Sequence, residues 1–233
     1  MINTSDIGLH SSTSCRIFER SQSLCHLTLG YPSHLAHAFR FPPDFPFPWN
    51  QLTSLVFECM SFACSIFHEV HAQCSRLITL VARVTVLDIH TEDFDANDTI
   101  LLPHLESLEL HLHGPGMRAL HSLIVPALSV LSFVTPNWGA DDPNLSTIAD
   151  MLHYSSSPLI DLHINDAVEE DIGCILKCYP RLLYLDLPLC YFALQTIKKM
   201  TCGGFVPNIQ AFRCRIYHDV VDMFLDMLET MGE

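Results

Sequence analysis

The chain has 233 residues, 49% hydrophobic and 16% charged, a composition that excludes a disordered segment and predicts a folded core. Twelve Lys and Arg residues stand against 26 Asp and Glu residues, which gives a formal net charge of −14. This charge opposes binding to nucleic-acid phosphates and to anionic membrane surfaces, and we expect neither as a partner.

Residues 1–23 form an irregular N-terminal segment, and we expect residues 1 to about 15 to be poorly ordered. They lack the basic and apolar regions of a secretory signal, and no apolar stretch of the chain is long enough to cross a bilayer. The ten cysteines contain no C-x-x-C pair, and a chain this long and apolar does not need disulfides. We therefore expect a reducing, intracellular location, cytoplasmic or nuclear.

A pattern of apolar residues, L-x-x-L-x-L, recurs from LCHLTL at Leu24 to IQAFRC at Ile209. The first positions of its eight copies are Leu24, Leu52, Leu77, Leu105, Leu128, Leu159, Leu182 and Ile209. Successive copies begin 23 to 31 residues apart, which is the period of leucine-rich repeats. The third copy has two possible registers, LITLVA from Leu77 or VTVLDI from Val84.

Each copy has the length of one short β-strand, in which alternate side chains face opposite sides. The first, fourth and sixth positions then point inward, a burial worth about 5–8 kcal/mol per copy. One copy cannot bury these side chains alone, so neighbouring copies must stack. We predict an α/β fold: an irregular leucine-rich-repeat solenoid (horseshoe) with a parallel sheet on the concave face and helices on the convex face. Residues 24–233 form this single domain.

Between the first two strands, a segment rich in proline and aromatic residues at about 31–50 predicts an ordered loop, since proline interrupts both helices and sheet ladders. The next intervening segment, residues 61–74, predicts a helix because Phe62, Ile66 and Val70 recur at intervals of four.

Three further helices are expected. Residues 142–154 begin with Asp142 as a predicted N-cap followed by a proline, and residues 166–179 begin with a capping-box-like pattern at Asp166. Residues 218–233 form an amphipathic helix at the end of the sequence.

A group of Cys and His residues in the 61–74 helix has spacing that zinc accepts. Its members are Cys64, His68, His71 and Cys74. Because the same helix face must turn toward the core, we interpret them as core residues and expect no metal and no cofactor. We interpret Cys174 and Cys178 as core residues too. No nucleophile elbow, phosphate-binding loop or H-E-x-x-H motif is present, and we predict that the protein is not an enzyme.

The inward positions also determine which strand residues face outward on the concave side, where solenoids bind their partners. The face carries both charged and aromatic residues, and the charged ones include Arg83 and Arg215. The predicted partner-binding residues are Glu58, Glu109, His111, Asp161, His163, Tyr184, Asp186 and Arg213.

In chain order, the stretches PWNQLTSLVF, CSRLITL, LPHLESLEL, VPALSVLSF, SSPLIDLHI, YPRLLYLDL and VPNIQAF resemble the repeat region of fungal F-box/leucine-rich-repeat proteins. The resemblance covers about residues 45–225. The repeats depart from the family in mostly lacking the Asn or Cys that follows each strand, with Cys190 the one match. The F-box motif, L-P-x-E followed by an amphipathic helix, is not found; its nearest counterpart has Pro46 and Pro48 in place of the helix.

The resemblance implies a protein–protein interaction module, such as the substrate-recognition region of an F-box-type ubiquitin-ligase adaptor. Contact with the ubiquitin-ligase core would then require an F-box outside this chain. The alternative is a standalone leucine-rich-repeat scaffold, or a truncated copy of the family, with no role in ubiquitin ligation.

Overall fold

The computed structural model describes all eight predicted strands and two of the predicted helices. The described residues are 23–30, 48–62, 70–86, 99–111, 120–134, 145–165, 169–192, 196, 198–199, 208–215 and 221. Several predictions concern residues outside these ranges, namely the N-terminal segment up to residue 22, the loop over 31–47, Cys64, His68, the Asp142 and Asp166 caps, and nearly all of the final helix.

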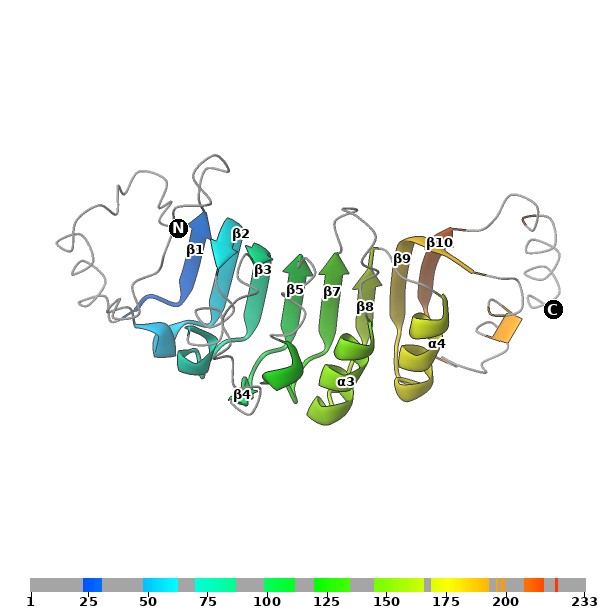
Figure 1. Cartoon of the computed structure of the whole chain (residues 1–233). Helices are drawn as coiled ribbons and strands as arrows, with labels where there is room; N and C mark the ends of the chain where they lie inside the picture. Colours follow the sequence, from blue (N-terminus) through cyan, green and yellow to red (C-terminus); the bar gives the residue numbers. More distant parts are fainter. Residues whose placement is uncertain are drawn as a thin grey trace.

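Eight strands form one sheet in which every neighbouring pair is parallel and the order in space follows the order in the chain (Figure 1). The strands are β1 (His26–Gly30), β2 (Ser54–Phe62), β3 (Thr79–Val86), β5 (Ser107–His111), β7 (Val130–Val134), β8 (Asp161–Ile164), β9 (Tyr184–Tyr191) and β10 (Ala211–Arg215). The predicted α/β class and the predicted parallel sheet are both confirmed.

The leucines of the repeat lie at equal height on neighbouring strands. At the second apolar position, one row crosses the whole sheet: Leu27, Leu55, Leu80, Leu108, Leu131, Leu162, Leu185 and Phe212. In the six central copies, all three apolar positions are buried. The copies at β1 and β10 include partly exposed members, since each edge strand pairs with a neighbour on one side only.

The register of the third copy is resolved by its neighbours. Leu80 pairs with Leu55 on one side and Leu108 on the other, so the copy begins at Leu77. Val84 belongs to the same long strand, beyond a β-bulge in β2 that shifts the pairing. The alternative register from Val84 is therefore wrong.

Two helices pack against the leucine side of the sheet, α3 (Ser146–Ser155) and α4 (Glu169–Cys178). Both place apolar residues at intervals of three and four in the same core as the strand leucines: Ile148, Met151 and Leu152 from α3, and Ile172, Ile175 and Leu176 from α4. Figure 1 shows both helices beside β7–β9 on one side of the sheet. The short 3₁₀ helix η3 (Trp49–Gln51) buries Trp49, the described end of the proline-rich segment.

Three details of the predicted helices are wrong. Ser61 and Phe62 are strand residues that pair with Thr85 and Val86, because the long β3 continues the ladder past the bulge. The described helical turn of this segment covers only 70–73. The helix α3 begins at Ser146, with Leu145 as its N-cap, which is later than predicted.

The third detail concerns the cysteines of α4. Cys174 and Cys178 are exposed, not core residues. The helix turns Ile172, Ile175 and Leu176 inward, and residues one helical turn apart on the opposite side face solvent.

The described chain also contains a pair of short parallel strands, β4 (Ile100–Leu101) and β6 (Leu123–Ile124), which the sequence pattern did not predict. Strands of two residues are too short for an alternation of apolar and polar residues to be recognised.

Leu131→Ala should lower the free energy of unfolding by about 2–5 kcal/mol, because it leaves a cavity at a fully buried position. The matched control is Val130→Ala on the preceding residue of the same strand, which is 37% exposed and should cost at most about 1 kcal/mol. Denaturant unfolding of both variants measures the difference. Equal losses would contradict the inward and outward assignment of the two side chains.

Candidate functional site: the outer face of the sheet

The strand side chains that point away from the leucines form a continuous surface, here called the outer face. Its first row is His26, Ser54, Thr79, Ser107, Val130, Asp161, Tyr184 and Ala211. Its second row is Thr28, Val56, Val81, Glu109, Ser132, His163, Asp186 and Arg213. A third row contains Glu58, Arg83 and His111. All eight predicted partner-binding residues lie on this face.

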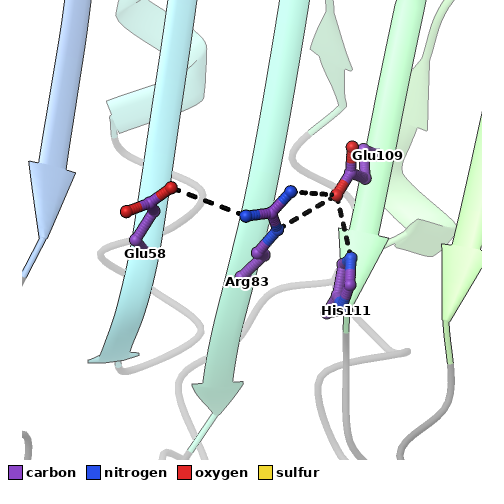
Figure 2. Close-up of polar contacts among 4 residues, drawn as sticks. All are labelled: Glu58, Arg83, Glu109 and His111. Carbon is purple, nitrogen blue, oxygen red and sulfur yellow. Dashed lines mark hydrogen bonds and ion pairs between the residues drawn. The ribbon is translucent and has the colours of Figure 1, made fainter. Parts of the chain in front are cut away.

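Four charged or titratable side chains from three adjacent strands meet near one end of the outer face (Figure 2). Arg83 on β3 lies between two carboxylates, and donates from Nε and Nη2 to Glu109 Oε1 at 3.0 and 2.8 Å. Its Nη1 is 3.5 Å from Glu58 Oε1 on β2. His111 donates from Nε2 to Glu109 Oε1 at 2.9 Å. We call these residues the N-terminal cluster.

Glu109 is the centre of the N-terminal cluster. Burial by itself would raise the pKa of its carboxyl group. The hydrogen bonds from Arg83 and His111, together with the charges of both groups, outweigh burial and leave the pKa below its usual value. Glu109 is therefore held ionised and in one orientation. The strand register predicts Arg83 on this face, but only the side-chain contacts reveal that Arg83 orders the cluster.

A second cluster, the C-terminal cluster, joins a histidine on β8, an aspartate on β9 and an arginine on β10. Asp186 accepts hydrogen bonds from Arg213 Nε at 2.5 Å to Oδ1 and from Arg213 Nη2 at 2.8 Å to Oδ2. His163 Nδ1 donates to Asp186 Oδ2 at 2.8 Å. The bidentate contact fixes the planes of both charged groups, which a lysine could not do.

Beside the C-terminal cluster, the first row carries Asp161 with an exposed side chain on each side. Asp161 pairs in register with Val130 on β7 and with Tyr184 on β9. Burial raises the pKa of Asp161, the charge of His163 lowers it, and the charge of Asp186 raises it; the net effect is a pKa above the usual value. The hydroxyl of Tyr184 donates to Gln210 Oε1 at 3.2 Å, which orients the ring.

Burial suppresses the reactivity of two of the described cysteines. Burial raises the pKa of the Cys74 thiol to about 12 and that of Cys214 to about 11, which keeps both thiols protonated and unreactive. Two members of the predicted Cys/His group are described, His71 and Cys74. Both side chains are buried. Within the described ranges, no three His, Cys, Asp or Glu residues gather as a metal site would require.

Searches for similar proteins found no protein-family model and no curated protein that matches this chain. In the described part of the chain, no helix combines the length and the apolar character needed to cross a membrane.

Glu109→Gln and Asp161→Asn should change stability in opposite directions at neutral pH. Folding lowers the pKa of Glu109 from its usual value of 4.5, so the ionised carboxylate stabilises the fold when the pH is above 4.5. This stabilisation is lost as the pH falls below 4.5. Glu109→Gln should therefore reduce the free energy of unfolding at neutral pH.

The pKa of Asp161 is raised by folding, so its ionised form costs stability at neutral pH, and protonation removes the cost. Asp161→Asn should increase the free energy of unfolding at neutral pH, with the gain vanishing below the usual value of 3.8. Denaturant titrations at neutral pH and at about pH 3 measure both effects. Variants that shift stability in the same direction would contradict the assigned environments.

Proposed function

We propose that the chain is a leucine-rich-repeat solenoid that binds another protein through the outer face of its sheet, the concave face of the solenoid. Eight parallel strands in chain order, repeated every 23 to 31 residues with their leucines in register, support this architecture. Helices α3 and α4 pack on the leucine side, so the described helices do not cover the outer face.

The observation that carries the proposal is the order of the polar groups on the outer face. Arg83, Glu109, Asp186 and Arg213 are each held by ion pairs that join neighbouring strands. Side chains that are already fixed lose less conformational entropy when a partner binds, so they present a preorganised surface. Eight strands spaced about 4.8 Å apart give a face roughly 34 Å wide, enough for an interface of ordinary protein–protein size.

The resemblance to F-box/leucine-rich-repeat proteins extends the proposal to substrate recognition for a ubiquitin ligase, with the ligase core joined through an F-box outside this chain. The alternative is a standalone scaffold that uses the same face for another assembly. Both use the outer face in the same way and differ only in what else the protein contacts.

The double variant Tyr184→Ala/Asp186→Ala should abolish capture of the partner from cell extract, because it removes an exposed ring and the centre of the C-terminal cluster. Quantitative mass spectrometry of proteins retained by the purified, immobilised chain measures the loss.

A matched control for that variant lies on the helix side. Asp150→Ala/Tyr154→Ala removes the same two residue types from the exposed surface of α3 and should retain every captured protein. Retention of all partners by the outer-face variant, or equal losses from both variants, would contradict the proposed binding face.

Co-purification separates the two roles. If the chain serves a ubiquitin ligase, the F-box-binding adaptor and a cullin should co-purify with the full-length protein from its own cells. Their absence, with other partners still captured through the outer face, would support the scaffold and contradict the ligase role.

A further inference from the structure

Among the described residues of the outer face, one carboxylate receives no hydrogen bond from a cationic side chain. Arg83 contacts Glu58 and Glu109. In the same way Arg213 contacts Asp186. The described residues provide no hydrogen bond or ion pair to the side-chain carboxylate of Asp161, whose backbone N–H donates to Ser129 O. The neighbouring imidazole of His163 is directed to Asp186, at 2.8 Å from its Oδ2.

The residues on both sides of Asp161 are apolar or aromatic and accessible. Val130 and Tyr184 are 37% and 43% exposed, and parallel pairing places each on the strand next to Asp161, about 4.8 Å away. The bond from Tyr184 to Gln210 holds the ring in place. The carboxylate therefore sits between two exposed hydrophobic surfaces.

From this arrangement we propose that Val130, Asp161 and Tyr184 form an anchoring site for one arginine or lysine side chain from a basic segment of the partner protein. The inference rests on the proposed function, because it specifies the chemistry of the partner that the outer face binds. The aliphatic stem of the basic residue packs on Val130 and Tyr184, and its charged head reaches Asp161. An arginine gains further from stacking on the Tyr184 ring.

The charge distribution of the outer face favours this partner over an acidic one. The described outer-face positions of β5, β7, β8 and β9 include Glu109, Asp161 and Asp186 but no Lys or Arg. The arginines that neutralise Glu109 and Asp186 come from β3 and β10 on either side. A net charge of −14 over the whole chain attracts basic partners at long range.

The stability of the unbound protein is consistent with such a site. The pKa of Asp161 is raised by burial and by the charge of Asp186, which means that its ionised form is incompletely compensated in the folded chain. A bound cation would supply the missing compensation. Binding sites often retain groups of this kind at the expense of stability.

The test uses short displayed peptides as the probe and the full chain as bait. The central residue of each peptide is Arg, Lys, Gln or Glu in equal numbers, and the flanking positions are random. We expect the selected peptides to have Arg or Lys at the centre. Their affinity should fall on the order of tenfold for Asp161→Asn and weaken for Tyr184→Ala, but not for Asp150→Asn on the exposed surface of α3.

A charge reversal provides an independent readout: the Asp161→Lys variant should select peptides with Glu at the centre. Selection of Gln or Glu peptides by the unmodified chain, no enrichment of Arg or Lys, or unchanged affinity for Asp161→Asn would overturn the anchoring site. If Tyr184→Ala/Asp186→Ala still abolishes partner capture in that case, the proposed function stands and only the anchor is wrong. Partner capture and peptide binding that are both insensitive to every outer-face variant would contradict both proposals.

Discussion

The structure depends on one constraint: each strand carries apolar side chains that only a neighbouring strand and the overlying segments can cover. Leu108 is buried because Leu80 and Leu131 lie beside it at the same height, and each of these needs its own neighbour in turn. A shift of one residue in any strand would move its leucines to the solvent side, so the register is strongly specified. The equal height of the leucines across the eight strands follows from this requirement.

The outer face is a consequence of the same register. Because side chains alternate along a strand, fixing the leucines at one height also fixes the residues between them in rows on the other side. Arg83 then stands opposite Glu58 and His111, within reach of Glu109 in the next row, and Asp186 stands opposite Arg213. Exposed ion pairs of this kind contribute only about 0.2–1 kcal/mol each. The core supplies the stability, which leaves the composition of the outer face open to the demands of binding.

The repeat pattern allowed the strands, their inward residues and the eight outer-face site residues to be predicted, because an alternation of period two is a local property of the sequence. Predictions failed where a distant partner decided the outcome. Phe62 fits a helical pattern with Ile66 and Val70, yet it pairs with Val86 because β3 extends far enough to continue the ladder. Cys174 and Cys178 belong to an apolar helix and were predicted to be core residues, but both are exposed. The helix instead packs Ile172, Ile175 and Leu176 against the leucine side of the sheet.

The amino-acid sequence by itself determined the strands, their faces and the residues of the outer surface, since each follows from spacing within a few residues. Only the tertiary structure decided how those residues pair: that Arg83 and His111 converge on Glu109, that His163 turns to Asp186, and that Asp161 is left between Val130 and Tyr184 without a cation from the described chain. The hydrogen bonds between strands join residues 23 to 27 positions apart in the chain, and they require the side-chain geometry of adjacent strands, which spacing alone does not contain.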